Sequence, residues 1–184
     1  IDMFGTGEDK NGNYTDNVKI SVRADSVQIA DDLQLLGENP LPQKWQDAVG
    51  ADGKLITNTL SYVKLGDGVD TVDEVVKTGS VPQKLVYVTV TYTNQSEEEI
   101  NHMLYLGSLM LLNHEDGRYF IQQDRSGNGF DCVIWDGAAQ ISDMTYFSVS
   151  EDYGNGGNYI SSLKPGESVQ VNMAWIVNES DLDD

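Results

Sequence analysis

The sequence predicts an all-β fold, an antiparallel β-sandwich with one or two short helices in an insertion. About seven to nine segments alternate apolar and polar residues or are rich in β-branched side chains, and Gly, Pro, Asn and Asp separate them. Helical periodicity is scarce. A chain of 184 residues with 39% hydrophobic content can bury one core of this kind. We therefore expect a single sandwich domain over residues 18–184, with an irregular insertion at about 33–79.

The start of the chain, residues 1–17, is expected to be a flexible leader or linker. Residues 5–17 are rich in Gly, Asn and Asp and show no apolar period. The next segment alternates as a strand does, but its apolar residues change from even to odd positions near Asp25. Because successive side chains of a strand point to opposite faces, this change predicts a β-bulge or a strand break.

The first part of the insertion is predicted to be irregular. Residues 33–55 contain two prolines and three glycines, and they favour one short helix around Trp45. Residues 57–65 then return to the pattern of a strand.

A second short helix is expected over residues 71–79, where Thr71 and Glu74 have the spacing of a capping box. Three acidic residues lie near its start: Asp67, Asp70 and Asp73. They could form a cation site, but acidic residues at a helix start are already explained by the helix dipole. We therefore favour the helix start.

The strand pattern is clearest in the middle of the chain. Four side chains share one face of the first strand there: Val86, Val88, Val90 and Tyr92. The continuously apolar residues 103–112 favour a strand that enters a hairpin. Asp116-Gly117 is the two-residue signature of a type I′ turn, so Glu115 and Arg118 are expected to pair across it.

The last part of the chain predicts three more strands. Two fall in residues 129–135 and 144–150, and Pro165-Gly166 forms the turn before the third. Five apolar side chains alternate along this last strand: Val169, Val171, Met173, Trp175 and Val177. Because Trp175 shares a face with the others, we expect it to pack in the core between the sheets.

The charge of the chain excludes several classes of partner. Thirty acidic and eleven basic residues give a formal charge of −19. Such a surface repels nucleic acid, which is not expected as a partner, and it also repels an anionic membrane. The sequence has no run of 18 apolar residues, which a helix would need to span a bilayer.

The side chains that could carry catalysis are few. Cys132 is the single cysteine, so no disulfide can form within the chain, and its apolar neighbours favour a buried role. His102 and His114 are the two histidines; about 12 extended residues would separate them by roughly 40 Å, too far to share a metal ion. No nucleophile elbow is present. We expect both histidines to be solvated loop or hairpin residues, no catalytic residue and no cofactor, and hence no enzyme.

Three segments in order carry a resemblance to a known family. They are the strand and acidic turn of residues 86–99 ("VYVTVTYTNQSEEE"), the hairpin of residues 114–120 ("HEDGRYF") and, after a Gly- and Asn-rich loop, residues 163–177 ("LKPGESVQVNMAWIV"). This order resembles the telokin-like, immunoglobulin-like domains of secreted Gram-positive lipoproteins. The resemblance implies an immunoglobulin-like sandwich that is extracellular and non-enzymatic. It also implies that the domain contacts the membrane only through a lipid anchor upstream of Ile1. It supplies no catalytic residues.

One stretch resembles the start of a calcium-binding loop. Oxygen-bearing residues occupy its first, third and fifth positions: Asp124, Ser126 and Asn128. Gly129 follows at the sixth position, as in an EF-hand. Asp131, however, replaces an apolar residue, and Trp135 stands where the bidentate Glu is required. We favour an isolated turn over a calcium site.

Residues 148–162 form the candidate recognition loop. Tyrosines interspersed with Asn and Gly at the end of a sandwich offer flat amphipathic contact area on an adaptable backbone. The candidate contact residues are Asp152, Tyr153, Asn158 and Tyr159. The alternative is a long connection whose glycines only satisfy the backbone.

The expected function is therefore non-enzymatic. We expect an extracellular, cell-surface domain that binds a surface protein or glycan or acts as a spacer, and a calcium- or carbohydrate-binding module is the alternative.

Overall fold

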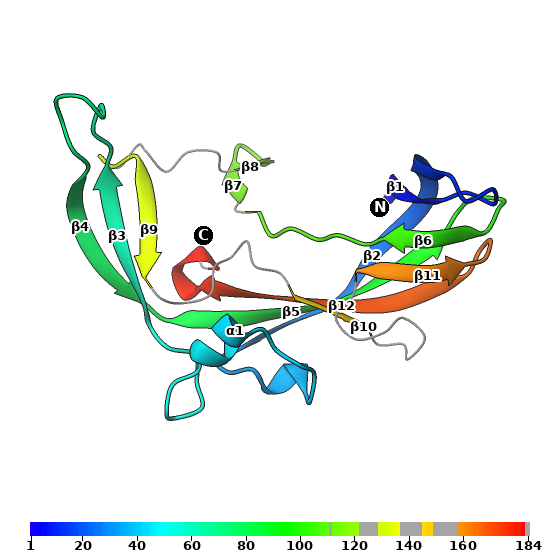
Figure 1. Ribbon diagram of the computed structural model, residues 1–184, viewed down its shortest axis with the longest axis horizontal. Helices are drawn as coiled ribbons and strands as arrows, with labels where there is room; N and C mark the ends of the chain where they lie inside the picture. The colour runs from blue at the N-terminus through cyan, green and yellow to red at the C-terminus, as the bar shows by residue number, and fades with distance from the viewer. Residues whose placement is uncertain (111, 122–128, 137–144, 149–157, 183–184) are drawn as a thin grey trace.

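The structure is a computed structural model that describes residues 1–110, 112–121, 129–136, 145–148 and 158–182. It confirms the predicted fold class, because the chain is built of antiparallel strands with few helices (Figure 1). No helix in these ranges is long and apolar enough to cross a bilayer.

A curled seven-stranded sheet forms the larger part of the fold. Its strand order is β10-β12-β5-β2-β1-β6-β11. The strands are β1 (Asp2–Glu8), β2 (Tyr14–Ala30), β5 (Gln83–Asn94), β6 (Ile100–Leu104), β10 (Thr145–Ser148), β11 (Tyr159–Leu163) and β12 (Ser168–Asn178). The long strands β2, β5 and β12 run along the molecule, and the sheet curls so that β1, β6 and β11 lie over one end of them (Figure 1).

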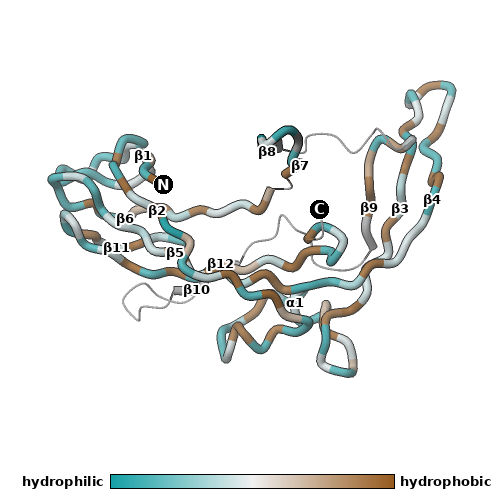
Figure 2. The backbone as a smooth tube through the Cα atoms, turned by 180° about the vertical axis from the view of Figure 1, so that it is seen from behind, coloured by the Kyte–Doolittle hydropathy of each residue, from teal (hydrophilic) through white to brown (hydrophobic). Residues whose placement is uncertain are grey.

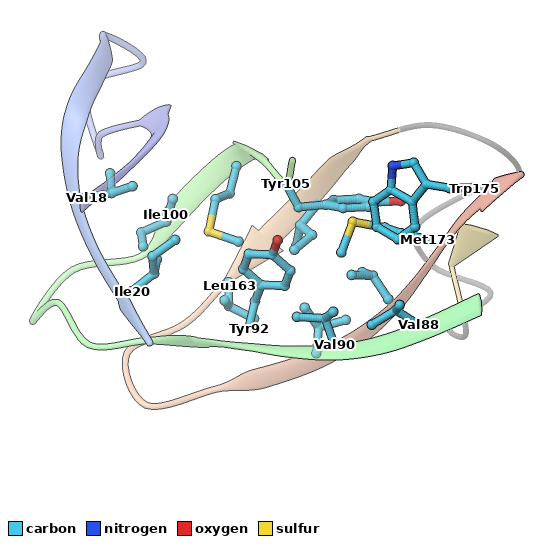
Figure 3. Close-up of a cluster of buried hydrophobic side chains, with 14 of the residues drawn as sticks. Val18, Ile20, Val88, Val90, Tyr92, Ile100, Tyr105, Leu163, Met173 and Trp175 are labelled. Atoms are coloured by element: carbon cyan, nitrogen blue, oxygen red, sulfur yellow. The ribbon is translucent and has the colours of Figure 1, made fainter. Parts of the chain in front are cut away.

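The first core fills the space inside this curl. The four predicted side chains of β5 and the five of β12 all lie in it, and Trp175 is only 4% exposed, as predicted. Side chains from the other half of the curl pack against them: Ile100, Met103, Tyr105, Ile160 and Leu163. Figure 3 shows Ile100, Tyr105 and Leu163 among them. Two halves of one sheet therefore enclose the core as the two sheets of a sandwich do.

The insertion covers the opposite face of β5 and β12. It contains the 3-10 helix η1 (Gln34–Leu36) and the helix α1 (Gln43–Asp47), which confirms the short helix predicted around Trp45. Leu36 and Trp45 are fully buried and pack with Leu85 and Ile176 in a second core. Figure 2 shows these hydrophobic segments of β12 and the insertion next to each other. The 3-10 helix η4 (Glu179–Asp181) follows β12.

Two smaller sheets complete the described fold. One has the order β4-β3-β9, from β3 (Asn58–Lys64), β4 (Glu74–Val81) and β9 (Cys132–Asp136). The other is the hairpin of β7 (Leu112–Glu115) and β8 (Arg118–Ile121). Asp116 and Gly117 both have positive φ, 48° and 76°, and Glu115 pairs with Arg118, so the type I′ turn is confirmed.

The predicted bulge is also confirmed. β2 runs through as one strand, and its register with β5 shifts between Ala24 and Ser26, which leaves Asp25 as the extra residue. The turn predicted at Pro165-Gly166 is present: Gly166 has φ 73°, and Glu167 N donates to Lys164 O over 2.9 Å.

The helix predicted over residues 71–79 is wrong. Residues from Glu74 onward form β4, which pairs with β3 along its length. Thr71 does not cap a helix, because its hydroxyl accepts a hydrogen bond from Asp67 N at 2.8 Å. A helix of this length is marginal by itself, and the β-branched side chains of the segment favour the strand once β3 is available.

The flexible leader predicted over residues 1–17 is wrong as well. Residues 2–8 form β1, which pairs with the first part of β2 and with β6. Gly5 and Gly7 are not linker glycines. A Cβ at Gly5 would lie 2.8 Å from Ile20 Cδ1, and one at Gly7 would lie 2.8 Å from Ile100 Cγ2. Glycine is favoured at both positions because β1 lies close to the core, and most strictly at Gly7, where a Cβ would also lie 3.3 Å from the Asn101 carbonyl oxygen.

Candidate recognition surface

The described part of the predicted recognition loop is its C-terminal end. Asn158 is fixed there, because its carbonyl accepts a hydrogen bond from Tyr105 N at 2.9 Å. Tyr159 begins β11 and is 47% exposed. Asp152 and Tyr153 lie outside the described residues, and so do Asp124, Ser126 and Asn128 of the candidate calcium loop.

Tyr159 belongs to a surface that the strand order brings together. Glu8 at the end of β1 pairs with Tyr14 on one side and with Asn101 of β6 on the other. Tyr159 of β11 pairs with Leu104 of β6. The order β2-β1-β6-β11 therefore joins residues that are far apart in the sequence.

The strand order β2-β1-β6-β11 places Tyr14 and Tyr159 on either side of Glu8. Tyr14 is 59% exposed and lies directly opposite Glu8, so the two side chains share a face. Partial desolvation raises the pKa of Tyr14, and the nearby Glu8 carboxylate and Tyr159 hydroxyl raise it further. We call Glu8, Tyr14, His102 and Tyr159 the tyrosine patch.

His102 binds Glu8 within this patch. Its Nδ1 lies 3.0 Å from Glu8 Oε2, and its side chain is 57% exposed. It has φ 44°, a left-handed conformation that costs a non-glycine residue roughly 1–3 kcal/mol and that concentrates at functional sites. His102 is thus exposed, as expected, but it lies in a strand rather than in a loop or hairpin.

An acidic groove adjoins the tyrosine patch and shares Glu8 with it. It has a volume of about 590 Å³. Its carboxylates come from the end of β1, from the β1–β2 turn and from the β5–β6 turn: Glu8, Asp9, Glu97, Glu98 and Glu99. Lys10 pairs with Glu98. Backbone hydrogen bonds from Asn13 and Asn11 lower the pKa of Asp9. Lys19 also lines the groove, but the carboxylates outnumber the lysines, so this rim of the patch is negatively charged overall.

The other residues singled out in the sequence have structural roles. Asp67 Oδ1 accepts hydrogen bonds from the backbone N–H groups of Val69, Asp70 and Thr71 at 2.8 to 2.9 Å, which lowers the Asp67 pKa strongly. Asp73 Oδ1 accepts from Gly66 N at 2.9 Å. In the part of the chain that is described, no three acidic, His or Cys side chains are grouped to hold a metal ion.

His114 and Cys132 lie away from the tyrosine patch. His114 is in β7 beside the turn, as expected of a hairpin residue, and its ring stacks on Tyr119 with centroids 4.7 Å apart. Cys132 is a partly buried free thiol in β9, opposite Val63.

Sequence reasoning did not find Glu8 and Tyr14. Both fall in the range taken for a leader, and what makes them part of a surface is the pairing of β1 with β6. The local signal available was Gly5 and Gly7 spaced by two residues, which suits one face of a strand as well as a linker.

Comparison with known proteins gives no relative. No protein-family model, no curated protein and no solved structure matches the chain.

Proposed function

We propose that the chain is a non-enzymatic binding domain whose recognition surface is the tyrosine patch. The observation that carries the proposal is the pair of exposed tyrosines on either side of the Glu8–His102 contact. Tyrosine supplies large contact area at a small entropic cost, and such residues dominate the binding energy of many interfaces.

The position of the patch supports recognition. Tyr14 and Tyr159 are each held at the first position of a paired strand, so little backbone ordering is needed when a partner binds. The tyrosine rings and Glu8 suit a Lys or Arg side chain, through cation–π contacts and an ion pair. The acidic groove beside them attracts the same kind of partner. A protein that presents basic residues is therefore the partner we propose.

We also propose that the domain lies at the outer surface of the cell. The resemblance to domains of secreted lipoproteins supports a place outside the cell, at its surface, with a lipid anchor upstream of Ile1. The test is the sequence upstream of Ile1 in the full precursor, where we expect an apolar signal that ends in small residues and a lipidated cysteine. A start codon directly before Ile1 would contradict this location.

The experiment is a binding screen of the parent and of the double variant Tyr14→Ala, Tyr159→Ala. Both are presented to arrays of surface proteins and of glycans, and retained partners are titrated. We expect the double variant to bind at least about thirtyfold more weakly, because truncated aromatic anchors often cost 2 kcal/mol or more.

The matched control is Tyr119→Ala, which removes a tyrosine that is 71% exposed in β8, outside the patch. It should leave affinity unchanged. Binding must also persist in added salt, because a charge of −19 attracts any cationic protein without specificity. A parent that binds nothing in the screen, or a double variant that binds as well as the parent, would refute the patch, and the first result would favour a spacer.

A further inference from the structure

A second groove lies on the outer face of β2, β5 and β12. The insertion covers one half of this face through Ala30, Leu85 and Ile176. The other half lies nearer the end of the molecule that carries β1 and β11. It contains a groove of about 380 Å³. This volume is at the lower end of the range for small-molecule sites, roughly 300–1,000 Å³, and suits a small ligand.

The groove is lined by two rows of polar side chains in strand register. The strand pairing aligns Ser21 with Thr93 and Thr93 with Ser168, which gives a row of three hydroxyls. The neighbouring row on the same face contains Arg23, Thr91 and Gln170, because Thr91 pairs with both Arg23 and Gln170. Neighbouring strands are about 4.8 Å apart, so the polar groups of one row are spaced for a ligand that carries several hydroxyls.

Asp25 organises the second row. As the extra residue of the bulge it lies beside this row, and its side chain is 18% exposed. Its Oδ1 accepts a hydrogen bond from Arg23 Nε at 2.6 Å. Its Oδ2 accepts from the Thr91 hydroxyl and, at 3.2 Å, from Gln170 Nε2. One carboxylate thereby holds three lining side chains in place before any ligand arrives.

The groups left for a ligand are both donors and acceptors. With Nε engaged, Arg23 still has its two terminal amino groups, and its side chain is 73% exposed. Gln170 keeps its amide oxygen, and the hydroxyl pair Thr93–Ser168, 2.7 Å apart, can accept or donate further.

The charge of the groove selects the class of ligand. Arg23 and Asp25 neutralise each other. A cationic ligand would have to compete with Arg23 for Asp25, and an anionic ligand is repelled by a protein of charge −19. A neutral ligand rich in hydroxyls meets neither cost, and adjacent hydroxyls of a sugar ring match the planar, two-pronged groups of Arg23 and Gln170.

We infer that this groove, with Arg23, Thr91 and Gln170 aligned by Asp25 at the bulge, binds a neutral saccharide. The site is separate from the tyrosine patch, because the patch is built on β1, β6, β11 and the start of β2. It does not depend on the proposed function.

The test is an NMR titration of the whole chain with maltotriose, cellotriose and triacetylchitotriose, taken to millimolar concentrations, with glucuronate as the anionic comparison. We expect at least one neutral sugar to cause saturable shifts of backbone amides in residues 91–93 and 168–170. Arg23→Ala and Gln170→Ala should each weaken that binding roughly fivefold or more, as expected for a lost hydrogen bond.

The control is Ser26→Ala, one row along the same face and outside the groove, which should bind as the parent does. Unfolding midpoints are measured for all variants; Gln170, which is exposed, provides the test if Arg23→Ala fails to fold. No saturable shift with any neutral sugar, stronger binding of glucuronate, or unchanged affinity in a folded variant would overturn the inference. Shifts confined to the tyrosine patch would overturn it too.

Discussion

At the scale of single residues, two tryptophans anchor the two cores from opposite faces of β12. Trp175 points into the curl of the large sheet, and Trp45 of the insertion packs on the other side with Ile176. The surroundings of Trp175 are closely packed, because a Cβ added at Gly107 would lie 3.3 Å from the Trp175 ring. Sites so filled collapse poorly when a large side chain is removed.

The first prediction is that Trp175→Ala destabilises the protein by roughly 3–5 kcal/mol, since it loses the buried ring and leaves a cavity. Chemical denaturation measures the loss. Tyr119→Ala, which truncates an exposed ring in β8, serves as the control and should cost little. A loss below about 1 kcal/mol for Trp175→Ala would mean that the ring is not part of the core.

The second prediction concerns Asp25 and pH. Hydrogen bonds from Thr91, Arg23 and Gln170 hold the pKa of Asp25 below its ordinary value. Because the folded pKa is lower than the unfolded value of about 3.9, ionised Asp25 stabilises the fold above about pH 4, and this stabilisation is lost as the pH falls further. Near neutral pH, we expect the parent to have a higher melting temperature than Asp25→Asn. This difference in melting temperature should shrink as the pH is lowered.

Thermal melts of the two proteins from neutral pH down to below about pH 4 make this comparison, and their difference cancels the titration of the other carboxylates. A gap that stays constant, or that widens at low pH, would show that the ionised form of Asp25 is not favoured by folding.

At the scale of elements, local pattern was sufficient wherever one strand or turn is specified by its own residues. The alternation along β5 and β12, the parity change at Asp25 and the Asp116-Gly117 turn each predict what the structure shows. The two wrong predictions concern residues 1–17 and 71–79. The structure of these segments depends on pairing with other strands rather than on their own sequence. β1 is fixed by β2 and β6, and β4 by β3.

The candidate site follows the same division. The role of Tyr159 in recognition could be proposed from the tyrosine, Asn and Gly residues of its own loop. Its neighbours Glu8 and His102 could not, because only the pairing of β1 with β6 and β6 with β11 brings them together. The left-handed conformation of His102 has no signal in the sequence.

The third prediction tests β1 as an element. Gly7→Ala should destabilise the protein by roughly 1–3 kcal/mol, because the added methyl would lie 2.8 Å from Ile100 Cγ2 and 3.3 Å from the Asn101 carbonyl oxygen. Denaturation of Gly7→Ala is compared with that of Asp2→Ala, an exposed change on the same strand. Equal stability of the two variants would contradict β1 as a paired strand and would support a flexible leader over residues 1–17.

At the scale of the whole molecule, charge and shape divide the surface into parts with different uses. The charge of −19 gives an acidic field throughout, and the acidic groove concentrates it beside the tyrosine patch. The β4-β3-β9 sheet stands at the opposite end of an elongated molecule (Figure 1). A partner held at the patch can therefore bind without touching this sheet.

The most direct test of the tyrosine patch is a hydrogen-exchange footprint of the partner retrieved in the binding screen. Amide exchange is measured along the chain with and without the partner, in added salt so that unspecific attraction is screened. We expect slower exchange at Glu8, at Tyr14 and through β6 to Tyr159, and no change in β3 and β4. A footprint that falls on the β4-β3-β9 sheet and leaves the patch unchanged would contradict the proposed recognition surface.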